Sequence, residues 1–148
     1  MAALRCATLR YAARMDALTY WPLRLQPGAD LRQDLEAAVA QRGCEAAFVL
    51  GGIGSLGEAQ LRLAGADQTL ALPGPLEVLT LSGSVGAKGS HLHASLSDAQ
   101  GRVLGGHLGY GCSVRTTAEV LLALLPDWRF TREPDAATGY EELVPRRR

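Results

Sequence analysis

The sequence predicts a sandwich-like α+β domain, built on a largely antiparallel β-sheet with two main helices. Short segments in which apolar and polar residues alternate predict strands, and they outnumber the two segments with a helical spacing of apolar residues. The strand segments follow one another in runs, which favours antiparallel pairing over regular βαβ alternation. A chain of 148 residues is long enough for one domain with a substantial core.

The first strand and the first helix are expected near the N-terminal end of this domain. The strand is expected at 23–25, where Pro22 favours a sheet edge or a strand start. The helix is expected to follow Asp30, an N-cap residue with Gln33 at capping-box spacing, and to run to Arg42. Its buried stripe is predicted to consist of Leu31, Leu35, Ala38 and Val39.

A glycine-rich segment lies between two further strands, expected at 46–50 and 58–63. Residues 52–57 match the GxGxxG pattern of dinucleotide-binding proteins. That fingerprint requires a helix after the glycines to hold the pyrophosphate, whereas residues 58–63 alternate as a strand. We therefore interpret the glycines as a turn whose backbone amides can also line a ligand pocket.

Two more strands, at 68–72 and 76–82, are expected on either side of a turn at 73–75. Glu77 shares its strand face with leucines, where an unpaired carboxylate is costly. In one interpretation, Glu77 is an acid–base group or a residue that positions the ligands of a nearby site. In the other, it is a carboxylate exposed to water at the end of the sheet. Residues 83–89 are expected to form a flexible link to the next strand.

All three histidines of the chain lie close together in sequence. His91 and His93 are two residues apart in an expected strand, so both rings project from one face. The turn chemistry of residues 97–101 predicts a hairpin that returns His107 beside them. Three imidazoles suit a divalent ion such as zinc, with a fourth position open to water or substrate. The alternative is three unrelated histidines, hydrogen-bonded in a core or at a subunit contact.

The second main helix is expected to start at Thr116 or Thr117 and to run to Leu125. A closing strand is expected at 128–132. The rest of the chain, apart from residues 141–144, is expected to form turns and a tail. The buried stripe of the second helix is predicted to consist of Val120, Leu121, Leu124 and Leu125.

The composition argues against several classes of partner. Fifteen basic and fifteen acidic residues cancel, so charge gives no case for binding nucleic acid or an anionic membrane. No apolar stretch approaches the roughly 20 residues that span a bilayer. Three widely spaced cysteines, Cys6, Cys44 and Cys112, favour reduced thiols and a cytoplasmic location. We expect an N-terminal extension at 1–22, the domain at 23–145 and a basic tail at 146–148.

A series of motifs from about Leu23 to Val144 resembles those of the PPC (plants and prokaryotes conserved) domain family. The motifs are RLQPGAD (24–30), GIGSL (52–56), GPLEVL (74–79), HLH (91–93), GRVLGGHL (101–108), RTTAE (115–119) and TGYEEL (138–143). The resemblance implies a homotrimer of compact subunits and, as in prokaryotic members, a metal held by His91, His93 and His107. It also implies a fold similar to acetolactate decarboxylase, whose zinc is likewise held by three histidines.

Two functions follow as hypotheses. In the first, the chain binds a small molecule beside the metal and is a candidate enzyme, with Glu77 or Arg115 assisting the ion. In the second, it is a trimeric regulatory or interaction module without catalysis. Plant relatives bind DNA through AT-hooks, which this chain lacks. An association with nucleic acid therefore comes only from the family resemblance.

Overall fold

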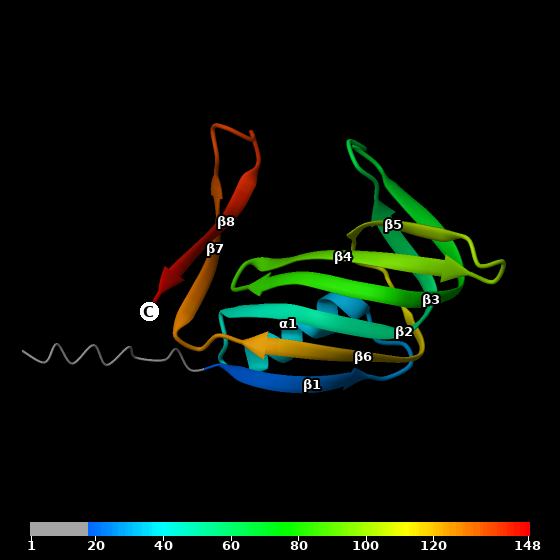
Figure 1. The fold of residues 1–148 in the computed structure, drawn as a ribbon, viewed down its shortest axis with the longest axis horizontal. Coiled ribbons are helices and arrows are strands. Elements are labelled where there is room, and N and C mark those ends of the chain that lie inside the picture. The colour runs from blue at the N-terminus through cyan, green and yellow to red at the C-terminus, as the bar shows by residue number, and fades with distance from the viewer. Residues whose placement is uncertain (1–17) are drawn as a thin grey trace, which may run out of the picture.

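A computed structural model describes residues 18–148 of the chain. Residues 1–17, which include Cys6 and most of the expected N-terminal extension, lie outside the described residues. The described part contains a six-stranded sheet, one α-helix and a two-stranded hairpin (Figure 1). Its elements are β1 (Thr19–Leu25), α1 (Leu31–Gln41), β2 (Ala46–Arg62), β3 (Thr69–Gly86), β4 (Gly89–Asp98), β5 (Val103–Leu108), β6 (Val114–Leu124), β7 (Trp128–Pro134) and β8 (Glu141–Arg147).

The six-stranded sheet has the order β1-β6-β2-β3-β4-β5, and all of its strand pairs are antiparallel. The predicted α+β class with a largely antiparallel sheet is therefore confirmed. The end of β2 also pairs with β5, with Leu61 opposite Leu108 and Arg62 opposite His107. At this end of the sheet β2, β3, β4 and β5 close into a ring, which we call the β2–β5 ring.

Helix α1 covers one face of the sheet and closes the core (Figure 1). Leu31, Leu35 and Val39 are buried there, as the helical spacing predicted. The predicted N-cap is also confirmed, because the Asp30 carboxylate accepts hydrogen bonds from the backbone N–H groups of Arg32 and Gln33. With 11 residues, the helix of the described chain is too short to cross a membrane.

The prediction of a second main helix at 116–125 is wrong, because these residues belong to β6. Burial along β6 follows a period of two: Ala118, Val120 and Leu122 are buried, whereas Leu121 is exposed. The spacing of the leucines in this segment is compatible with a helix and with a strand. The segment forms a strand because it is paired with β1 on one side and with β2 on the other.

The turn expected at 52–57 is also wrong, because β2 continues through these residues. The glycines instead permit close contact between backbones. At Gly54, for example, an added Cβ would overlap the carbonyl oxygen of Thr117 on β6. Register shifts in this part of β2 bend the strand without ending it.

Two further expected breaks lie inside or beside β3. Residues 73–75 were expected to form a turn, but they continue the strand. Proline has no N–H to donate and is tolerated where a strand has a neighbour on one side only. This is the case here, because pairing with β4 starts only at Leu76. The flexible link expected at 83–89 is wrong as well. β3 runs to Gly86, which pairs with Gly89 across a two-residue turn.

The β7–β8 hairpin projects from one end of the sheet (Figure 1). Its anchor is Phe130, which is 4% exposed and meets the Phe48 ring edge to face at a centroid distance of 5.3 Å. An ion pair of 2.6 Å between Arg148 and Glu45 lies beside this anchor. In the expected basic tail at 146–148, Arg146 and Arg147 belong to β8. Arg146 pairs with Glu133, and Arg148 pairs with Glu45.

Gly83→Ala should cost about 3 kcal/mol or more of unfolding free energy. Gly83 has a φ of +143°, and an added Cβ would overlap the His91 carbonyl oxygen on β4. Gly101→Ala is the control, because Gly101 also has positive φ but open space around the missing Cβ, and should cost about 1–2 kcal/mol. Urea unfolding measures both, and equal losses would contradict the close strand approach.

Candidate metal centre

Strands β4 and β5 bring the three histidines to one point. His93 lies directly opposite His107, and His91 lies two residues before His93 on the same strand face. Nε2 of His91 and Nε2 of His93 each lie 3.0 Å from Nδ1 of His107. One ring nitrogen from each histidine lies within 4.8 Å of the others. The convergence predicted from the sequence is therefore present.

The arrangement of these nitrogens fits a cation better than hydrogen bonds alone. Nδ1 of His107 faces both other rings, yet it carries one proton or one lone pair and cannot form two well-directed hydrogen bonds. A divalent ion, in contrast, would accept one lone pair from each of the three nitrogens. Two ligands at zinc-bonding distance in tetrahedral geometry lie about 3.3 Å apart, close to the observed 3.0 Å.

The surroundings favour the neutral form of two of the rings, those of His91 and His107. Burial lowers the pKa of His91, and the nearby His93 and Arg132 lower it further. Burial also lowers the pKa of His107, with Arg62 and His93 acting in the same direction. A neutral imidazole has a free lone pair, which is the form of histidine that can bind a metal ion.

A cavity of about 700 Å³ opens beside two of the histidines. It lies between the β2–β5 ring, the start of α1 and the β7–β8 hairpin. This size is in the usual range for small-molecule sites. Its charged and titratable lining consists of His91, His107, Arg32, Arg62, Arg132, Tyr140, Glu141 and Glu142.

A hydrogen-bond network centred on Glu36 ties α1 to the histidine strand. The Glu36 carboxylate accepts from the Ser90 N–H at 2.9 Å and from the Ser90 hydroxyl at 2.6 Å. It also accepts from the Tyr110 hydroxyl at 3.0 Å and from Nε of Arg32 at 3.1 Å. These bonds fix the residue immediately before His91.

Arg32 continues this network to both histidine strands. Its guanidinium donates to the carbonyl oxygen of Ser90 at 2.7 Å and to that of Leu108 at 3.1 Å. These two residues are the chain neighbours of His91 and His107. The sequence analysis missed this role, although Arg32 and Glu36 have the i, i+4 spacing of a helical ion pair.

The structure does not bring Glu77 and Arg115 to the histidines within one chain. Glu77 lies opposite Ser97, on the same face of the sheet as the rings but four residues along β4 from His93, or about 13 Å. Arg115 is exposed on β6, outside the β2–β5 ring. Neither residue lines the histidine cavity.

The described cysteines are free, buried thiols. Burial raises the pKa of the Cys112 thiol to about 11, so it is protonated at neutral pH. Its Sγ accepts from the Gln60 N–H at 3.2 Å and lies 3.3 Å from the Gly109 carbonyl oxygen. Cys112 is therefore part of the packed core.

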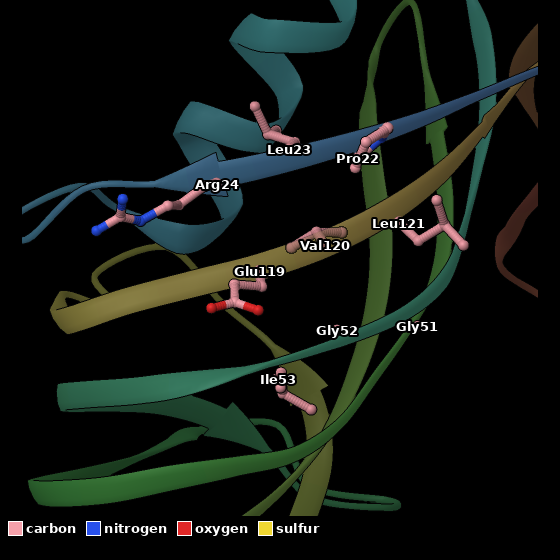
Figure 2. A pocket seen from close by; sticks show the side chains of 9 residues that line it. All are labelled: Pro22, Leu23, Arg24, Gly51, Gly52, Ile53, Glu119, Val120 and Leu121. Carbon is pink, nitrogen blue, oxygen red and sulfur yellow. The ribbon is translucent and has the colours of Figure 1, made fainter.

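A second hollow, of about 540 Å³, lies on β1, β6 and β2, away from the histidines (Figure 2). Pro22 lies opposite Leu121, which in turn lies opposite Gly51, so this row of residues projects from one sheet face. Ile53 adds a side chain that is 58% exposed. The hollow is a largely apolar stretch of surface, and we call it the apolar trough.

Comparisons with known proteins support a common fold. The family model of the Plants and Prokaryotes Conserved (PCC) domain matches residues 13–126. The bifunctional protein GlmU of Synechococcus sp. strain JA-3-3Ab is 51% identical over 127 residues, which are 86% of this chain and 20% of GlmU. The chain thus spans about a fifth of the length of the curated relatives it matches.

Solved structures show the same architecture. A hypothetical protein from Salmonella cholerae-suis is 41% identical with a TM-score of 0.86, over 90% of this chain and 96% of that one. A metal-containing protein from Archaeoglobus fulgidus is 27% identical with a TM-score of 0.71, over 85% and 93%. A candidate DNA-binding protein from Ralstonia eutropha is 25% identical with a TM-score of 0.69, over 83% and 89%.

Glu36→Gln should lower the free energy of unfolding by about 1–3 kcal/mol. The amide keeps the shape of the side chain but loses the charge that accepts from Ser90, Tyr110 and Arg32. Glu58→Gln is the control, because Glu58 is exposed on β2 and its change should stay within about 0.5 kcal/mol. If urea unfolding gives the same loss for both variants, Glu36 does not hold α1 to β4.

Proposed function

Because this chain belongs to the Plants and Prokaryotes Conserved domain family, we propose that it is a metal-binding member with an open three-histidine site. His91, His93 and His107 would hold the ion, and the adjoining cavity would receive a small molecule. The observation that carries this proposal is the convergence of the three ring nitrogens. The metal-containing relative from Archaeoglobus fulgidus, with the same fold, supports it.

Zinc is the ion we propose, because three neutral imidazoles with an open fourth position are typical of zinc sites. A bound zinc would polarise a carbonyl group or lower the pKa of a bound water. The chain's own contribution is to orient the rings through the β4–β5 pairing and the Glu36 network. The proposal covers small-molecule binding with or without turnover, and assistance by Glu77 or Arg115 remains a prediction.

We also propose that the protein is a homotrimer in the cytoplasm. The apolar trough supports an interface between copies of this chain, since exposed apolar patches of this kind mark contact surfaces (Figure 2). A trimer would use two different surfaces of each subunit in a closed ring. The free, buried thiols of Cys44 and Cys112 are compatible with a reducing compartment.

Untagged protein should contain close to one zinc ion per chain by elemental analysis, and His93→Ala should lose it. Removing one of three ligands leaves too few donors for stable binding. Native mass spectrometry of the same sample should give the mass of three chains with three ions. Ser95→Ala, two residues along the same strand, is the control and should retain zinc. Wild-type protein without metal would contradict the proposal.

A second candidate function is a regulatory module that associates with DNA. The observation that favours it is the fold shared with the candidate DNA-binding protein from Ralstonia eutropha. The balanced charge of this chain gives no independent support.

Titration with duplex DNA at about 50 mM and about 200 mM salt distinguishes the two functions, because phosphate contacts weaken steeply as salt rises. Under the metal-site proposal we expect no saturable binding at either concentration. Fluorescence anisotropy of labelled DNA provides the measurement. Saturable binding that falls at least about 100-fold between the two salt concentrations would support the regulatory module instead.

A further inference from the structure

Two arginines without acidic partners flank the histidine cluster. Arg62 lies directly opposite His107 in the β2–β5 pairing, and its side chain is exposed. Arg132 comes from β7, where its guanidinium donates to the buried hydroxyl of Ser84 at 3.2 Å. Among residues 18–148, no carboxylate lies within ion-pair distance of either guanidinium.

Both arginines act on the cavity. Both line it, together with His91 and His107. Arg62 lies directly opposite His107, and the Ser84 hydroxyl that binds Arg132 belongs to the residue directly opposite His91. The third arginine of the lining, Arg32, has its charge balanced by Glu36 and its N–H groups used by two backbone carbonyls.

We propose that this cavity binds a small molecule through an oxyanion, a carboxylate or a phosphate, held by Arg62 and Arg132 beside the histidines. The planar guanidinium group offers paired N–H donors that match such oxygens. An anion would also pair with two guanidinium groups that form no ion pair among residues 18–148. This inference rests on the proposed metal site, because the ligand would lie next to the bound ion.

Two acidic residues of the β7–β8 hairpin suggest the rest of the ligand. Glu141 and Glu142 line the cavity from β8. Carboxylates accept hydrogen bonds, so this part of the cavity suits hydroxyl or ammonium groups. The ligand class is therefore a small, hydroxylated or aminated acid or phosphate ester, with its oxyanion between Arg62 and Arg132 and its hydrogen-bond donors near Glu141 and Glu142.

Isothermal titration calorimetry of the zinc-loaded, untagged protein tests this proposal with three probes. Gluconate carries a carboxylate, glucose 6-phosphate carries a phosphate, and sorbitol is the neutral reference. At least one of the two anions should bind about tenfold or more tightly than sorbitol, because a charge-assisted pair to arginine is worth at least that factor. The preferred anion identifies the oxyanion as carboxylate or phosphate.

Arg62→Gln and Arg132→Gln should each weaken binding of the preferred anion about tenfold or more. Arg102→Gln is the matched control and should bind as the wild type does, because Arg102 lies at the other end of the β4–β5 hairpin, outside the histidine cavity. If Arg132→Gln does not fold, Arg132→Lys replaces it, and its loss of paired donors should still weaken binding. Equal affinity in the wild type and the Arg62 and Arg132 variants would overturn the proposal.

Metal content separates this test from that of the proposed function. Arg62→Gln and Arg132→Gln should keep the wild-type zinc content by elemental analysis, since neither residue supplies a ring nitrogen to the site. Retained zinc with lost anion binding supports the subsite. Retained zinc with no preference for anions over sorbitol overturns the subsite alone. Wild-type protein without zinc overturns the metal site, and arginine-dependent anion binding would then still support the subsite.

Discussion

The histidine centre depends on the double pairing of β5, with β4 on one side and the end of β2 on the other. This pairing sets Arg62, His107 and His93 in a row across three strands. Directly opposed residues of antiparallel strands project from the same face, so the row brings one cation and two rings together. A register slip of one residue in β5 would turn His107 to the opposite face. The site therefore needs the closed ring and not only the hairpin.

The site could be predicted from the sequence where it depends on local geometry. The i, i+2 spacing of His91 and His93 and the turn at 97–101 are short-range features, and the structure has both. The N-cap at Asp30 is equally local and was predicted correctly. The family predicted from the motifs is confirmed by the match over residues 13–126. The spacing, the turn and the N-cap each lie within a few residues of the feature that they predict.

The errors occur where distant strands decide the local structure. The apolar spacing after Thr117 fits a helix, but the neighbours β1 and β2 supply the hydrogen bonds that make a strand. The glycines of 52–57 resemble a turn, yet they serve close contact with β6. The Glu36 network was missed for the same reason, because Glu36 and Ser90 are far apart in sequence. A local sequence pattern does not reveal a hydrogen-bond partner that is distant in sequence.

The β7–β8 hairpin meets the sheet through the Phe130 anchor, the nearby ion pairs and the hydrogen bond from Arg132 to Ser84. It supplies Arg132, Glu141 and Glu142 to the cavity. The metal-facing rings, in contrast, belong entirely to the sheet. Under the proposed function, the sheet alone would hold the ion, whereas the hairpin would contribute some of the contacts to the small molecule. Replacement of the β7–β8 hairpin, by evolution or by design, could therefore change which compound binds while the three imidazole rings stay in place.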